Sequence, residues 1–224
     1  MVGDLDAATA RADGELEDTG IPLNAAGTAV DLGAGVGLHS LPLARRGYKV
    51  IAVDSCEPLL QELRSRADSL AVRTVKADLL DFRTYVATRA DVILCMGDTL
   101  THLPDAPSVE FLFSSVAAAL ARGGLFVATF RDYASTPLQG DERFILVRGD
   151  ENRILTCFLE YSDKIIRVHD VLHEQAGGNW QLRLSSYQKL RLAPEWVVKV
   201  LASHGFSVRC EPGLSGMVRV VARL

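Results

Sequence analysis

The chain has 224 residues, of which 48% are hydrophobic and 23% are charged, and its formal net charge is −4 at pH 7. This length and composition are typical of one globular domain with room for an added subdomain. The acidic balance argues against bulk electrostatic binding to nucleic acid, and no apolar run reaches the roughly 18–20 residues of a membrane span. The four cysteines show no paired spacing, and the first residues lack the pattern of a secretory signal. We therefore expect a reduced, cytoplasmic protein with no membrane partner.

Residues 1–24 are rich in Asp, Glu, Ala, Gly and Thr, and we expect them to form a mobile or helical arm. From residue 28 onward, apolar runs of strand length alternate with amphipathic segments of helix length. This alternation with short loops predicts a parallel sheet covered by helices on both faces. The expected strands are 28–32, 49–53, 70–76, 91–96 and 125–130, and the expected helices are 38–46, 58–67 (capped by Ser55) and 108–122 (capped by Ser108 and ended by Gly123 and Gly124).

The pattern changes at residues 143–190, where period-2 runs are separated by turn residues. The runs 143–147, 153–161, 164–173 and 180–190 predict an antiparallel meander. A last helix, 194–204, then precedes strands at 206–211 and 217–222. We expect one domain made of 25–142 and 191–224, with 143–190 as a lid over the substrate side or as a dimer surface.

A glycine loop joins the first strand to the first helix of this domain. Gly33, Gly35 and Gly37 follow Asp31 in the pattern D-x-G-x-G-x-G. Glycines at such a loop let the backbone pass close to a ligand. A dinucleotide fingerprint needs Gly or Ala at the position of Leu38, so the spacing disfavours a nicotinamide dehydrogenase.

Carboxylates follow the next two strands at the same edge of the sheet. Asp54 ends the second strand and Asp78 follows the third. Asp54 there can accept two hydrogen bonds from a ribose diol, and Asp78 can accept one from an adenine amino group. Either residue alone reads as a helix cap or a solvated loop residue. Together with Asp31, they indicate a nucleotide-like ligand.

On these residues, the chain from about 28 to 224 resembles the class I S-adenosylmethionine-dependent methyltransferases. The resemblance implies an α/β, Rossmann-like sheet of seven mostly parallel strands, with the last strand antiparallel and helices on both faces. It implies S-adenosyl-L-methionine as cofactor and S-adenosyl-L-homocysteine as product. By this likeness Gly33, Gly35 and Gly37 pass under the methionine part, Asp31 organises its ammonium, Asp54 binds the ribose, Asp78 and Leu79 flank the adenine, and Met96, Gly97 and Asp98 lie beside the reacting methyl.

A closer likeness is to the glycine N-methyltransferase group. The segment 95–105 resembles its fourth motif, with Asp98 where the group usually has Asn. Arg131-Asp132-Tyr133 resembles its Arg-Asn-Tyr, whose Arg grips a substrate carboxylate. The short arm before the first strand departs from the group. The resemblance therefore favours a small-molecule acceptor more strongly than it favours glycine.

Methyl transfer from a sulfonium is an in-line displacement with a neutral leaving group, so the protein mainly aligns the nucleophile and excludes water. Arg131 can hold a carboxylate, or it can form a surface ion pair with Asp132 or Asp141. Tyr133 can orient a nucleophile or pack its ring, and His102 can act as a base or as a solvated residue at a helix start. Two histidines of the meander lie too far apart for one metal, and we expect no metal site. The remaining aromatic residues, Tyr161, Trp180 and Tyr187, read as packing, and His39 as a helix surface residue.

The sequence thus predicts an enzyme that moves a methyl group from S-adenosylmethionine to a nitrogen or oxygen of a small molecule. A nucleic-acid (tRNA or rRNA) methyltransferase is an alternative, although base-modifying enzymes typically carry Asp/Asn-Pro-Pro-Tyr where this chain has Gly97-Asp98-Thr99-Leu100. A non-catalytic S-adenosylmethionine-binding regulatory protein is another. We expect a monomer or homodimer that does not bind nucleic acid.

Overall fold

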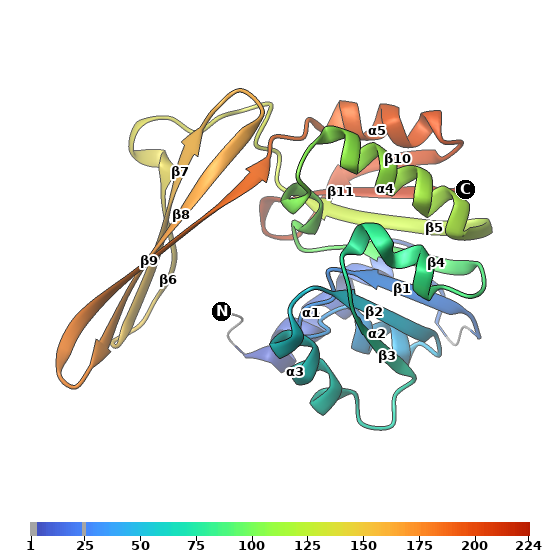
Figure 1. Ribbon diagram of the computed structural model, residues 1–224, viewed down its shortest axis with the longest axis horizontal. Coiled ribbons are helices and arrows are strands. Elements are labelled where there is room, and N and C mark those ends of the chain that lie inside the picture. The colour runs from blue at the N-terminus through green and yellow to red at the C-terminus, as the bar shows by residue number, and fades with distance from the viewer. Residues whose placement is uncertain (1–3, 24–25) are drawn as a thin grey trace.

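The computed structural model describes residues 4–23 and 26–224. The expected boundary between arm and domain, at residues 24 and 25, lies outside the described residues. Figure 1 shows a body of helices around a central sheet, from which a second sheet projects. The central sheet has seven strands in the order β10-β11-β5-β4-β1-β2-β3, and the second has four in the order β6-β7-β8-β9.

The central sheet confirms the predicted fold class. Its parallel strands are β1 (Thr28–Leu32), β2 (Lys49–Asp54), β3 (Val72–Lys76), β4 (Ala90–Cys95) and β5 (Leu120–Phe130), and it is completed by β10 (Ser207–Pro212) and β11 (Val218–Arg223). The last strand, β11, runs antiparallel to both of its neighbours, β5 and β10. The inner strands β1 and β4 read as nearly continuous apolar runs because helices bury both faces of the sheet there.

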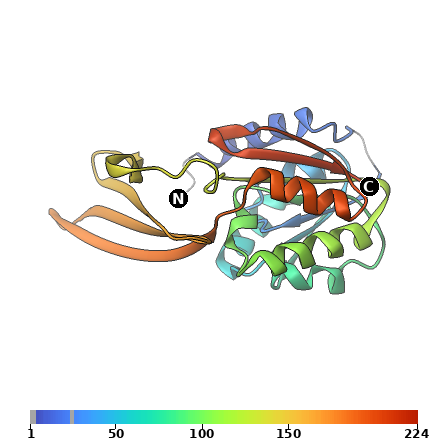
Figure 2. The same cartoon turned by 90° about the horizontal axis from the view of Figure 1, so that it is seen from above.

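Two groups of helices cover the sheet, and Figure 2 shows α1 and α4 on opposite sides of it. Buried side chains of α1 (Leu5–Asp18), α2 (Ser40–Arg45) and α3 (Glu57–Ala67) pack on one face. Those of α4 (Ala106–Ala119) and α5 (Pro194–Ser203) pack on the other. The described residues also form four short 3-10 helices: η1 (Leu79–Tyr85), η2 (Thr99–His102), η3 (Gly140–Arg143) and η4 (Leu214–Gly216).

Both predicted helix caps are wrong by a few residues. The residue before α3 is Cys56, which has no side-chain capping bond, and not Ser55. The cap of α4 is Asp105, whose carboxylate accepts from the backbone N of Ser108 at 2.8 Å. The helix ends at Ala119, before the expected stop at Gly123, because β5 begins at the next residue. The pairing of β4 with β5 contains a bulge in this region.

The second sheet is the predicted antiparallel meander, inserted after β5. It comprises β6 (Phe144–Gly149), β7 (Arg153–Tyr161), β8 (Ile165–Ala176) and β9 (Asn179–Leu190). Its inner face buries Leu159, Ile166 and Val168 against Tyr133, whereas its outer face carries exposed side chains such as Leu184. Among the described residues, no helix has the length and apolar character that would let it cross a membrane.

Candidate cofactor and acceptor site

A cavity of about 280 Å³ lies where β1, β2 and β3 end. Doubly wound sheets bind ligands at this edge. The cavity unites Gly33, Asp54, Asp78, Leu79 and His102 among the predicted site residues. Its full lining is Gly33, Asp54, Ser55, Ala77, Asp78, Leu79, Thr99, His102, Leu103 and Pro104.

The glycine loop forms one wall of this cavity. Gly33 has φ +74°, and a Cβ built on it would lie 2.4 Å from Cγ2 of Thr99, so only glycine fits there. Its backbone N donates to the carbonyl of Val53 at 2.8 Å, which ties the loop to β2. Gly35, with φ +52°, differs because a Cβ on it would meet no protein atom within 4 Å. The space above Gly35 is therefore open to a ligand.

Asp54 is fixed at the cavity wall by two backbone donors. Its Oδ2 accepts from the N of Gly35 and its Oδ1 from the N of Cys56, both at 2.8 Å. A carboxylate has about four acceptor positions, so both oxygens can still accept from a ligand. Asp78, on the next strand end, caps η1 by accepting from the N of Leu80 at 2.9 Å. Asp78 therefore caps a helix and lines the cavity at the same time.

Several other predicted cofactor residues do not line this cavity. Asp31 is buried, and its carboxylate accepts from Oγ of Ser40 at 2.6 Å. Burial raises the pKa of Asp31, against the opposing effects of His39 and of the Ser40 hydrogen bond. Met96 is buried at the end of β4, and Gly97 donates its N to the Thr129 side chain. Neither these residues nor Gly35 and Gly37 are among those lining the cavity.

Asp98 is the centre of a buried hydrogen-bond cluster, which we call the Asp98 hub (Asp98, Thr101, Arg131, Tyr133 and Lys189). Its Oδ1 accepts from the backbone N of Arg131 at 2.9 Å and from Oγ1 of Thr101 at 3.1 Å. Its Oδ2 accepts from the Tyr133 hydroxyl at 3.3 Å and from Nζ of Lys189 at 2.5 Å. Four donors occupy this carboxylate, so its side chain organises the protein and leaves little capacity for a ligand.

Lys189 is a charged residue of the candidate site that the sequence did not indicate. Its side chain is 11% exposed and that of Asp98 is 7% exposed, so the two charges form a buried pair. The Lys189 ammonium also lies 5.8 Å from the ring centroids of Tyr133 and Tyr187. Asp in place of the usual Asn signals that a cation must lie nearby, because a buried carboxylate needs a partner. The sequence does not indicate which of its 24 cations that is.

His102 connects the cavity to the meander. Its ring stacks on Tyr187 with centroids 5.5 Å apart, so the interpretation of Tyr187 as a packing residue was incomplete. Partial burial of the His102 ring and then the charge of Lys189 lower its pKa, and Asp98 opposes them. Burial, then Asp170, raises the pKa of Tyr187 to about 12. At neutral pH the site therefore presents a neutral imidazole beside a protonated phenol.

Tyr133 and Arg131 leave the end of β5 in different directions. Tyr133 is buried, and burial together with Asp98 raises the pKa of its phenol well above the usual range, so it remains a donor. Arg131 is exposed, and its Nη1 donates to the carbonyl of Ser215 at 3.0 Å. In the part of the chain that the structure describes, Arg131 makes neither of the predicted ion pairs, because Asp132 turns back to cap the backbone of Ala134.

Two histidines outside the cavity, His169 and His39, have protein partners. His169 contacts Glu160 at 3.2 Å and Ser186 at 2.9 Å on the outer face of the meander. His39 is not the surface residue that the sequence suggested, since it lies 3.4 Å from the buried Glu15 of α1. This contact ties the N-terminal helix to the end of the glycine loop.

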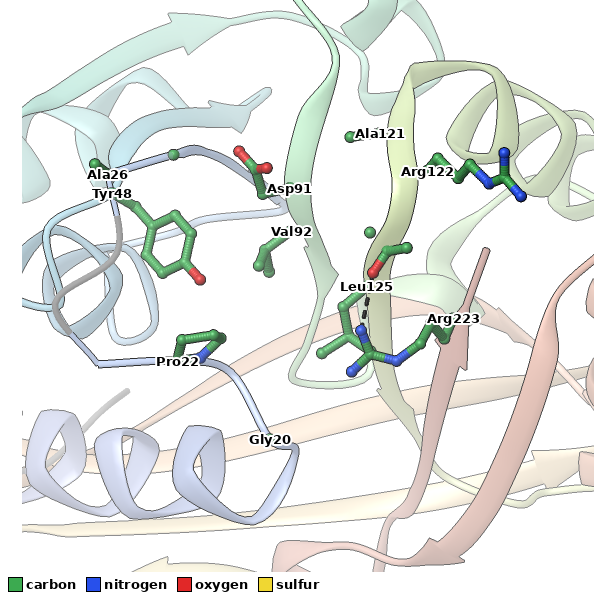
Figure 3. A pocket seen from close by; sticks show the side chains of 13 residues that line it. Gly20, Pro22, Ala26, Tyr48, Asp91, Val92, Ala121, Arg122, Leu125 and Arg223 are labelled. Atoms are coloured by element: carbon green, nitrogen blue, oxygen red, sulfur yellow. Dashed lines mark hydrogen bonds between the residues drawn. The ribbon is translucent and has the colours of Figure 1, made fainter.

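A second cavity, of about 340 Å³, lies at the opposite end of the sheet, where β1 and β4 begin (Figure 3). Tyr48, Asp91 and Arg223 line it, and Arg223 donates to the carbonyl of Gly123 at 2.8 Å. It contains none of the predicted site residues. The candidate site is therefore the first cavity.

Residues 29–124 match the family described as Methyltransferase domain. A glycine/sarcosine N-methyltransferase of Aphanothece halophytica is 29% identical over 107 residues, which cover 46% of this chain and 40% of that protein. A glycine N-methyltransferase of Rattus norvegicus is 24% identical over 208 residues, covering 84% and 71% respectively. The solved structure of an amino pentose methyltransferase from Micromonospora echinaspora, with S-adenosylmethionine bound, has a TM-score of 0.71 and 19% identity, covering 97% and 90%. The chain thus spans less than half the length of the Aphanothece relative.

Proposed function

The chain carries a methyltransferase domain and the class I S-adenosylmethionine-dependent methyltransferase fold, and from this premise we propose that it transfers a methyl group in line to a nitrogen or oxygen of a small molecule. The family match, the curated relatives and the fold of the solved structure together confirm the predicted family resemblance. Our proposal for the activity of the whole protein rests on one observation. The ends of three separate strands bring Gly33, Asp54, Asp78 and Leu79 to one cavity.

The residues of this cavity fit S-adenosylmethionine. Asp54 lines the cavity, and each of its oxygens accepts one backbone hydrogen bond and retains acceptor capacity for a ribose diol. Asp78 and Leu79 line the same cavity and flank the adenine in our proposal. The open space over Gly35 takes the methionine part, and Asp31, Gly37, Met96, Gly97 and Asp98 shape the loop and turn around it.

When bound, the cofactor supplies an electrophilic methyl group and a neutral thioether leaving group. We assign the remaining tasks to three side chains. The neutral imidazole of His102 takes the proton of an acceptor that arrives protonated. Tyr133 positions the acceptor and helps to exclude water. Arg131 is exposed and donates one guanidinium N–H to Ser215, and its remaining donors hold an anionic group of the acceptor.

A small-molecule acceptor is supported by the relatives, whose names describe enzymes acting on glycine, sarcosine and an amino pentose. We propose that residues 143–190 form the wall of the acceptor side, and that 25–142 with 191–224 form the cofactor domain. We further propose a cytoplasmic protein that does not bind nucleic acid. Of the expected monomer or homodimer, we favour the homodimer, because the outer face of the meander exposes Leu146, Leu182 and Leu184.

Calorimetry tests the proposed function. Wild-type protein is titrated with S-adenosylmethionine and S-adenosylhomocysteine, and we expect binding to both. Asp54→Ala loses a charged acceptor and weakens binding by roughly 10- to 100-fold. Asp81→Ala removes an equal charge from an exposed position of η1 outside the cavity, so its affinity stays unchanged. Absence of binding by the wild type at millimolar ligand would refute the proposal.

A further inference from the structure

The inner face of the meander leads away from the Asp98 hub in successive rows. Residues at alternate positions share one face of a sheet, and successive rows on that face are roughly 7 Å apart. Asp170 therefore lies one row beyond Tyr187 and two rows beyond Lys189. The cross-strand pairs that define the rows are Ile166–Lys189, Val168–Tyr187 and Asp170–Ser185.

Asp170 differs from the other acidic side chains on the meander strands. Glu160 lies 3.2 Å from His169, and Glu174 lies 2.7 Å from Arg183. Asp170 makes neither an ion pair nor a side-chain hydrogen bond with any residue in the ranges 4–23 and 26–224. It is half-buried on the inner face, opposite the buried Cys157 of β7. A half-buried carboxylate with no partner is unfavourable, and a cationic ligand would relieve that cost.

The cations near Asp170 are already engaged elsewhere. Lys189 and Arg131 act electrostatically on the Cys157 thiol together with Asp170, which places all three charges in one neighbourhood. The Lys189 ammonium is paired with Asp98, and a guanidinium nitrogen of Arg131 donates to a main-chain carbonyl. Among the described residues, the Asp170 carboxylate therefore has no cation as a partner, and it can bind a cationic ligand.

An aromatic ring stands between Asp170 and the cofactor cavity. Tyr187 is diagonal to Asp170 on the inner face, and its other neighbour, His102, lines the cavity. A carboxylate beside an aromatic face is a combination that binds alkylammonium groups. Building on the proposed function, we propose that Asp170 is a specificity-determining residue that binds a positively charged amino group of the acceptor, with the Tyr187 ring lying along the acceptor between that group and the cavity.

Paired probes of equal shape test this assignment without knowledge of the natural acceptor. Cyclohexylammonium and cyclohexanol are titrated by calorimetry into protein saturated with S-adenosylhomocysteine at pH 7.5. The wild type is expected to bind the ammonium probe roughly tenfold or more tightly than the alcohol, as for a hydrogen bond to a charged group. Asp170→Asn is expected to abolish most of this preference. Glu160→Gln, which removes a charge from the outer face of the same sheet, is expected to retain it.

The outcomes separate this inference from the proposed function. Unchanged affinity of Asp170→Asn for S-adenosylhomocysteine shows that the variant is folded and its cofactor site intact. A wild type without preference for the ammonium probe, or a preference that survives in Asp170→Asn, overturns the assignment. If the wild type fails to bind S-adenosylhomocysteine, the proposed function fails instead, and the probe titrations on the free protein still decide the role of Asp170.

Discussion

The buried pair of Asp98 and Lys189 provides a quantitative test of the structure. Removing one partner of a buried ion pair typically costs about 3–5 kcal/mol of unfolding free energy, because the other charge is left uncompensated. Asp98→Asn leaves the Lys189 ammonium, 11% exposed, without a carboxylate, so we expect a loss of about 3 kcal/mol or more. Lys189→Met leaves Asp98 with its other donors, Tyr133, Thr101 and the N of Arg131, so we expect a smaller loss of about 2 kcal/mol.

The double variant Asp98→Asn/Lys189→Met removes both charges and therefore costs less than the two single changes added together. We expect a coupling of about 2 kcal/mol or more, measured by urea unfolding at pH 7.5. The pair Arg183 and Glu174, also on the meander, is the control. Its Arg183 side chain is 68% exposed, and such surface pairs couple by about 1 kcal/mol or less. Additive losses in the Asp98–Lys189 cycle would refute the buried pairing.

Further predictions concern the loop, the imidazole and the outer face. Gly33→Ala forces a Cβ against Thr99 and is expected to cost about 2 kcal/mol of unfolding free energy, whereas Gly35→Ala is expected to cost about 1 kcal/mol. Gly35→Ala is nevertheless expected to weaken S-adenosylmethionine binding more than Gly33→Ala does, because its Cβ enters the space that we propose for the ligand. Full affinity of Gly35→Ala in calorimetry would contradict a ligand above that residue. The His102 ring is expected to titrate by proton NMR with a midpoint below 6.5, so the base is present above that pH and lost as the pH falls through the midpoint; a midpoint at or above 6.5 would argue against it. Wild-type protein is expected to sediment as a homodimer and Leu184→Lys as a monomer, since Leu184 is 69% exposed on the outer face; a monomeric wild type would exclude that interface.

Local sequence signals predicted most of the sheet and of the cavity that we propose for the cofactor. Alternating apolar runs predicted the parallel sheet, because strands buried on both faces are apolar throughout. The glycine loop and Asp54 were recognisable because they lie close together in the chain and depend on backbone geometry within a strand–turn–helix unit. Errors at this level were small shifts between neighbouring residues. Asp105 and Ser108 both lie at the start of α4, and Asp105 caps this helix in place of the predicted Ser108.

The acceptor side was decided by tertiary structure. Lys189 meets Asp98 across 91 positions of the chain, and Tyr187 meets His102, because the register of the meander directs alternate residues of β9 toward the end of β4. A shift of one residue in that register would turn both side chains to the outer face, since side chains alternate along a strand. The period-2 pattern indicated that β9 is a strand, but only its pairing with β8, whose Ile166 and Val168 pack with Tyr133, established which of its faces completes the candidate site.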